Sequence, residues 1–288
     1  MNELDIILED LNPEQREAVT HTDGPLLILA GAGSGKTTVL TRRVAYLISR
    51  GVPPQLILTI TFTNKAANEL KTRIETMLGD RARGIWAMTF HAACARILRA
   101  EYPDIGRSGR FSIADSQDQV KIMKLCLKEL DLSEKQYAPK GVLHAVSSAK
   151  DCLMSPEAYC QQASTFYETK VAEAYALYQA KLTEMDTLDF DDLIVETVRL
   201  FQEHPHILRK YQERFRYIMV DEYQDTNHAQ YVFTKLLAQV HRNIAVVGDD
   251  DQSIYTFRAL ISGTSLSSRR ITLHPRLSNS RRTTVRPR

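Results

Sequence analysis

The stretch AGAGSGKTT, Ala30–Thr38, decides the fold of this chain. It follows an apolar run, LLIL at Leu26–Leu29, and it opens an amphipathic stretch over Thr37–Ser49 that predicts a helix. A glycine-rich turn between a buried strand and a helix lets backbone N–H groups close around phosphate oxygens. The helix N-terminus adds a partial positive charge at the same place. The sequence therefore predicts a phosphate-binding P-loop.

Each position of this stretch has an expected task. Lys36 should reach the β- and γ-phosphates of a nucleotide, and the Thr37 hydroxyl should hold Mg²⁺. One position departs from the strict pattern, because Ala30 stands where glycine is usual. A glycine-rich turn without a ligand is the alternative, and the flanking strand and helix disfavour it. The residues expected to bind ATP here are Ala30, Gly31, Ala32, Gly33, Ser34, Gly35, Lys36, Thr37 and Thr38.

Further apolar runs repeat the strand-then-helix pattern, which is typical of a parallel sheet with crossover helices. Helices are expected over Lys65–Met77 and from His91 to about Ala100. The other predicted strands are Leu56–Thr61, Ile85–Thr89, Tyr217–Val220 and Ile244–Val247. From about Gly106 the pattern changes to helical stretches at 115–130, 134–150 and 155–185, with breaks near Pro139 and Pro156. An α/β domain interrupted by a helical insert is the simplest interpretation.

Two acids, Asp221 and Glu222, directly follow the predicted strand YIMV. The carboxyl ends of parallel strands meet at one edge of a sheet, which is also the edge that carries a P-loop. Asp221 is expected to bind Mg²⁺, and Glu222 to orient and deprotonate the attacking water. The alternative interpretation is a pair of solvated acids at a strand end. The buried strand before them makes this alternative the less favoured interpretation.

Composition sets limits on the kind of protein. Of the 288 residues, 43% are hydrophobic and 25% are charged, which is typical of globular proteins. The net charge is +2, but seven arginines follow Arg258 without any acid, so residues 1–258 carry −5. Nucleic acid would therefore have to bind in a local groove. The four cysteines form no CxxC pair and are expected to be buried free thiols. Without a signal peptide or a membrane span in the sequence, a cytoplasmic location is expected.

Seven motifs in order carry a family resemblance. The chain resembles the N-terminal half of superfamily 1 DNA helicases of the UvrD/Rep/PcrA group, from about Leu11 to Arg258. Besides AGAGSGKTT, the matching stretches are LNPEQREAV, TFTNKAANEL, TFHAACARIL, LDFDDLI, VDEYQDTN and VVGDDDQSIYTFR. The resemblance implies a RecA-like P-loop NTPase with a parallel sheet and an inserted helical subdomain. Its core would comprise residues 1–106 and 187–258, and its insert residues 107–186.

The resemblance also implies roles for single residues. Gln15 would hydrogen-bond the adenine edge, although an exposed polar residue near a helix start is the alternative. Gln252 would sense the γ-phosphate and, with Lys36 and Glu222, complete the catalytic set. Tyr255 and Phe257 would stack on bases, which is worth about 1–3 kcal/mol per base. The residues expected along the DNA track are Phe62, Asn64, His91, Phe190, Tyr255, Phe257 and Arg258.

The function implied by the resemblance is an ATP-dependent 3′–5′ DNA helicase that acts on single-stranded and duplex DNA with ATP and Mg²⁺. A second motor domain in cis, expected to supply arginines to the nucleotide, is missing from the sequence. Hydrolysis by this chain alone is therefore expected to be poor. Two rivals stay open: a non-enzymatic module that binds ATP and single-stranded DNA, and a small-molecule P-loop kinase.

The last 30 residues, 259–288, differ in character from the rest and are expected to form a disordered basic tail. Restoring one base after the Arg258 codon allows a consistent reading that contains NYRST, the family's next motif. We therefore hypothesise that this tail is translated out of frame. A natural basic tail that binds DNA electrostatically is the alternative.

Overall fold

The computed structural model describes residues 3–31, 33–249, 257–258, 260 and 269–274. Its centre is a six-stranded sheet in the order β3-β2-β6-β7-β1-β8, in which every neighbouring pair is parallel. The strands are β1 (Leu26–Ala30), β2 (Ile57–Thr61), β3 (Trp86–Thr89), β6 (Tyr217–Val220), β7 (Ile244–Gly248) and β8 (Arg269–Leu273). The expected α/β class with a RecA-like parallel sheet is confirmed.

Helices cover both faces of the sheet, because successive strand residues point to opposite sides. Leu26 and Ile28 of β1 belong to one core, and Leu27 and Leu29 belong to the other. The first face packs against α1 (Glu3–Leu8), α2 (Pro13–Thr20), α3 (Lys36–Ser49) and α4 (Asn64–Leu78). The second packs against α5 (Phe90–Glu101), α10 (Phe190–Glu203), α11 (Pro205–Arg214) and α12 (His228–Ala238).

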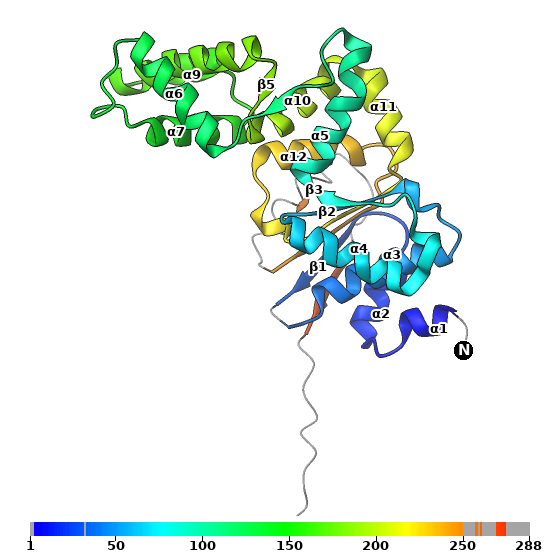
Figure 1. The fold of residues 1–288 in the computed structure, drawn as a ribbon. Coiled ribbons are helices and arrows are strands. Elements are labelled where there is room, and N and C mark those ends of the chain that lie inside the picture. Colours follow the sequence, from blue (N-terminus) through cyan, green and yellow to red (C-terminus); the bar gives the residue numbers. More distant parts are fainter. Residues whose placement is uncertain (1–2, 32, 250–256, 259, 261–268, 275–288) are drawn as a thin grey trace, which may run out of the picture.

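A helical insert stands to one side of the sheet, drawn in green in Figure 1. Its chain leaves and re-enters the main body through a two-stranded parallel ladder, β4 (Ser112–Ile113) and β5 (Thr187–Leu188). The insert has a hydrophobic core of its own. Its helices are α6 (Ser116–Glu129), α7 (Pro139–Asp151), α8 (Pro156–Gln162) and α9 (Phe166–Glu184).

Prolines and capping residues set where these helices begin. Pro139 and Pro156 each occupy the first turn of a helix, where a missing N–H costs nothing. The stretch expected to be mostly helical over 155–185 consists of two helices, α8 and α9. Thr165 forms a capping box with Glu168 and starts α9 anew.

The basic tail is not wholly without structure. Arg269–Leu273 form β8, which pairs in parallel with β1 at the sheet edge. Ile271 and Leu273 are buried while their neighbours are exposed, so alternation of apolar and polar residues explains this strand. The expectation of disorder is therefore wrong for these five residues, whereas the out-of-frame origin of the tail stays a hypothesis.

Two smaller findings complete the fold. All four cysteines are free thiols, but Cys152 and Cys160 are exposed, so the expectation of burial holds only for Cys94 and Cys126. Across the described ranges, every helix is too short or too polar to span a lipid bilayer.

Candidate functional site

The P-loop joins the end of β1 to the start of α3. Gly33 and Gly35 have φ values of +74° and +90°, in the left-handed region that favours glycine. The Ser34 hydroxyl donates to the Gly31 carbonyl over 2.7 Å, which closes the turn. A Cβ atom built on Gly35 would lie 2.9 Å from Nε2 of Gln15. Glycine is therefore needed at position 35 for both its backbone conformation and the space.

Gln15 supports this loop from α2. Its Nε2 donates to the Ser34 carbonyl over 2.8 Å, and its Oε1 accepts from the Asn12 backbone N–H over 3.1 Å. The Asn12 side chain in turn accepts from the Gln15 N–H, which completes a capping box. Gln15 is buried, so the alternative of an exposed polar residue is wrong. Its contact with adenine stays a prediction.

Lys36 lies between two carboxylates at the sheet edge. Its Nζ is 3.1 Å from Oε2 of Glu222 and 3.5 Å from Oδ2 of Asp249. Burial alone would lower the pKa of Lys36, but the hydrogen bond that its ammonium donates to Glu222 and the charges of both acids raise it. The side chain is 16% exposed, so phosphates of a nucleotide could compete with these carboxylates for the ammonium.

The acids at the end of β6 face the P-loop. Asp221 is buried and accepts a hydrogen bond from the Glu222 N–H over 3.0 Å. Burial and the neighbouring Glu222 charge raise the pKa of Asp221 to about 6. Glu222 has a φ of +48°, an uncommon backbone conformation for a residue with a side chain. This bend accompanies the hydrogen bond of Glu222 to Lys36.

Two further residues of this edge were not expected from the sequence. Gln224 donates from Nε2 to Oε2 of Glu222 over 2.8 Å and accepts at Oε1 from the Asp249 N–H over 3.1 Å. Asp249 follows Gly248, the last residue of β7, and β7 pairs directly with β1. That adjacency was the available signal, because the ends of neighbouring parallel strands share one edge.

The same edge fits Mg²⁺ only together with a nucleotide. Within the described part of the chain, no three His, Cys, Asp or Glu side chains are grouped to hold a metal. Mg²⁺ commonly takes one or two protein oxygens and completes its shell with phosphates and water. The Thr37 hydroxyl at the start of α3 and the Asp221 carboxylate are of the type required.

Several residues expected to contact DNA lie at the beginnings of helices. Asn64 starts α4 and is exposed, and Phe190 starts α10 and is 45% exposed. His91 lies in the first turn of α5, and its ring meets that of Phe190 edge to face with centroids 6.0 Å apart. Phe62 is half-buried, and its ring packs on Phe90, with centroids 5.6 Å apart. The structure thus brings His91 and Phe190 together.

One expected base-stacking residue is placed elsewhere. Phe257 is 1% exposed and belongs to the hydrophobic core, so its ring is not available to a base in this conformation. The expectation for Phe257 is corrected: its ring gains more from burial in the apolar core. Arg258 beside it is exposed. Three other expected residues, Ala32, Gln252 and Tyr255, lie outside the described residues.

Comparison with known proteins gives a consistent result. The model of the UvrD/REP helicase N-terminal domain matches residues 11–266. The chain is 52% identical over 253 residues to the ATP-dependent DNA helicase PcrA of Bacillus subtilis, covering 88% of this chain and 34% of the relative. It is 48% identical over 256 residues to PcrA of Staphylococcus epidermidis and of Staphylococcus aureus, covering 88% of this chain and 35% of each. The chain therefore spans about a third of the length of these relatives.

Proposed function

Because the chain belongs to the family of UvrD/REP helicase N-terminal domains, we propose that it is the ATP-binding motor part of an ATP-dependent DNA helicase. The contact between Lys36 and Glu222, 3.1 Å at the end of β6, carries this proposal. It joins a phosphate-binding lysine to an acid that can activate water, which is the pairing that ATP hydrolysis requires.

The proposal assigns the residues as follows. The P-loop residues 30–38 and Gln15 bind ATP, with Thr37 and Asp221 on Mg²⁺. Glu222 acts as the base, and Lys36 and Gln252 act on the γ-phosphate. The DNA track is formed by Phe62, Asn64, His91, Phe190 and Arg258, which are exposed or half-buried, together with Tyr255, which lies outside the described residues. The motor core comprises residues 1–106 and 187–258, with residues 107–186 as its insert.

Movement along single-stranded DNA in the 3′–5′ direction and unwinding of duplex DNA belong to the proposed function of the whole protein. The 52% identity to a protein named as an ATP-dependent DNA helicase supports the unwinding activity, and the direction rests on the family resemblance alone. Efficient hydrolysis would need arginines from a second motor domain, since such a group is worth about 10³–10⁵ in rate. A cytoplasmic location, where ATP and DNA meet in a bacterial cell, belongs to the same proposal.

A titration with a fluorescent ATP analogue and Mg²⁺, followed by ATPase assays with and without oligo-dT, tests the function. We expect nucleotide binding and an ATPase rate that rises with oligo-dT. Glu222→Gln should keep nucleotide binding and abolish the stimulated rate, since an amide cannot accept the proton. Binding of both ligands without any hydrolysis would favour the non-enzymatic module. Phosphate transfer to a nucleoside without DNA stimulation would favour the kinase.

A further inference from the structure

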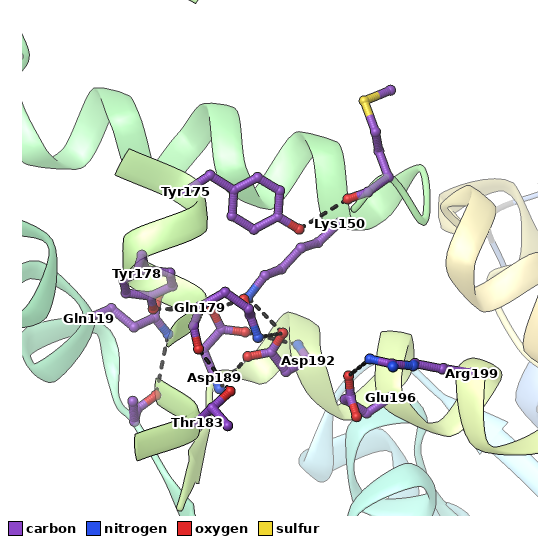
Figure 2. Close-up of polar contacts among 12 residues, drawn as sticks. Gln119, Lys150, Tyr175, Tyr178, Gln179, Thr183, Asp189, Asp192, Glu196 and Arg199 are labelled. Atoms are coloured by element: carbon purple, nitrogen blue, oxygen red, sulfur yellow. Dashed lines mark hydrogen bonds and ion pairs between the residues drawn. The ribbon is translucent and has the colours of Figure 1, made fainter. Parts of the chain in front are cut away.

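The C-terminal end of α7 reaches from the insert into the main body. Lys150 is 1% exposed, and its Nζ lies 2.7 Å from Oδ2 of Asp189 and 2.7 Å from Oδ1 of Asp192. Figure 2 shows this ammonium enclosed by the two carboxylates, with Tyr178 and Gln179 beside them. Tyr178 donates its hydroxyl to Asp189 over 3.1 Å, and Gln179 donates to Asp192 over 3.1 Å. The Lys150 ammonium and the two carboxylates are therefore paired and buried, whereas Oε1 of Gln179 has no hydrogen-bond partner among the described residues.

The two carboxylates also begin α10. Asp189 is the N-cap and accepts from the Asp192 N–H over 2.8 Å, while Asp192 accepts from the Asp189 N–H over 3.1 Å. This capping box fixes the first turn of the helix. Phe190 lies inside that turn, directly after the cap. The position of the Phe190 ring thus depends on a cap that Lys150 holds from the insert.

The next residue, Asp151, makes a second connection. Its carboxylate accepts a hydrogen bond from the side chain of Asn227, which is the N-cap of α12. Asp151 also acts on His91: burial lowers the pKa of His91, and the Asp151 charge raises it in part. Lys150 thus acts on the helix start that carries Phe190, and the Asp151 charge acts on His91, whose ring is in contact with that of Phe190.

Attachment of the insert to the main body would not by itself require buried ion pairs. Burying three charged groups has a desolvation cost, and apolar residues would join the insert to the core as well. Two buried carboxylates share one ammonium, and burial together with the neighbouring Asp189 charge raises the pKa of Asp192. The ion pairs also fix the orientation of the helix start, because each one holds a carboxylate whose other oxygen takes part in the capping box of α10.

We propose that Lys150 and Asp151 are positioning residues, through which the insert sets the first turns of α10 and α12 and holds Phe190 and His91 in their DNA-contacting arrangement. This inference rests on the proposed DNA-binding function. It gives the insert a part in forming the DNA track without itself touching the strand.

The test is a double-mutant cycle on binding of a labelled oligo-dT, measured by fluorescence anisotropy with the full chain. The paired variant Lys150→Met with Asp189→Asn removes one buried charge of each sign, and Asn can still cap α10. It is combined with Phe190→Ala. The control pair is Lys181→Met with Glu129→Gln, which removes an ion pair of 2.6 Å that joins α9 to α6 within the insert.

We expect Phe190→Ala to weaken oligo-dT binding about fivefold or more, as loss of stacking on one base implies. The paired variant should weaken binding about threefold or more, and adding it to Phe190→Ala should change little further. The control pair should stay within about twofold of the unmodified chain. Additive effects of the paired variant and Phe190→Ala would overturn the inference, because a structural role alone does not act through Phe190.

Folding and function are checked separately. If circular dichroism shows that the paired variant does not fold, Asp189→Asn alone enters the same cycle with the same criteria. If the unmodified chain does not bind oligo-dT, the proposed function fails. If it binds and Phe190→Ala changes nothing, DNA binding stands and the inference fails.

The Asp151 branch has its own readout. Asp151→Ala should lower the pKa of His91, followed by its ring resonances in an NMR titration, because the nearby negative charge is lost. Thr183→Ala on α9 serves as control and should leave that pKa in place. An unchanged pKa of His91 in Asp151→Ala would remove His91 from the proposal.

Discussion

Two lysines of this molecule each face two carboxylates, and their surroundings differ. Lys36 contacts Glu222 and Asp249 at the sheet edge, with 16% of its side chain exposed and its partners 39% and 43% exposed. Lys150 contacts Asp189 and Asp192 with 1% of its side chain exposed, and both partners are almost completely buried. The first cluster can exchange a carboxylate for a phosphate, and the second cannot exchange anything without unfolding locally. Solvent access therefore separates the proposed nucleotide site from the proposed positioning contact, although the two clusters have similar composition.

Removing the buried ammonium should have the largest effect on stability. Lys150→Met leaves two buried carboxylates without their counter-ion, and we expect a loss of about 3–5 kcal/mol in the free energy of unfolding. Urea unfolding followed by circular dichroism measures it. Lys181→Met, at a partly exposed ion pair of the insert, should cost less than about 1 kcal/mol. Equal losses in the two variants would show that burial does not distinguish them.

Replacing the lysine of the more exposed cluster, Lys36, by methionine should affect ligand binding rather than stability. We expect Lys36→Met to weaken binding of ATP and Mg²⁺ by about 30- to 1000-fold, because the phosphates lose a partly buried cation. Its free energy of unfolding should change by less than about 1 kcal/mol, since water solvates the half-exposed Glu222 and Asp249. Fluorescent-nucleotide titration and urea unfolding give the two numbers. A large loss of stability with unchanged affinity would reverse the assignment of the two clusters.

Lowering the pH should weaken nucleotide binding by protonating Asp221, whose pKa is raised to about 6. A protonated carboxyl does not bind Mg²⁺, so affinity for the ATP–Mg²⁺ complex should be level above pH 6. Below pH 6 it should fall by about tenfold per pH unit. Titrations between pH 5 and pH 8 measure this profile. Asp221→Asn corrects for protonation of the nucleotide itself, and an equally steep profile in that variant would exclude Asp221 as the titrating group.

The sequence predicts the sheet well because short apolar runs followed by amphipathic helices leave few alternatives. Tyr217–Val220 is a strand over the residues expected, and Lys36–Ser49 is a helix that begins one residue before its expected start. Hydrophobic periodicity alone did not predict every helix boundary. Thr165, for example, caps a new helix and so divides the helical stretch over 155–185. The sequence-based prediction also missed β8, which pairs with the neighbouring β1 and buries Ile271 and Leu273, while an exposed ion pair joins its Arg269 to Glu17.

The candidate site was predictable where a motif fixes the local backbone, and less so where distant segments meet. Lys36 and Glu222 follow from their motifs, and the structure brings them within 3.1 Å. Asp249 joins them through sheet order, which a single sequence does not state, whereas Gln224 lies two residues after Glu222 in the same motif. Phe257 carries an aromatic ring that suits stacking and core packing equally, and its burial is decided by the whole fold.

The smallest effect expected from this comparison concerns Asp249. Its carboxylate is 3.5 Å from Lys36 and 43% exposed, so it binds the ammonium weakly and also repels an approaching phosphate. Asp249→Asn should therefore strengthen nucleotide binding by up to about threefold at low salt. The gain should shrink as salt is raised, because exposed charges are screened. It should be smaller when Lys36→Met is added, because competition for the ammonium is then absent and only the repulsion of the phosphate remains. Titrations at two salt concentrations measure it; weaker binding in Asp249→Asn would instead make this carboxylate a part of the nucleotide site.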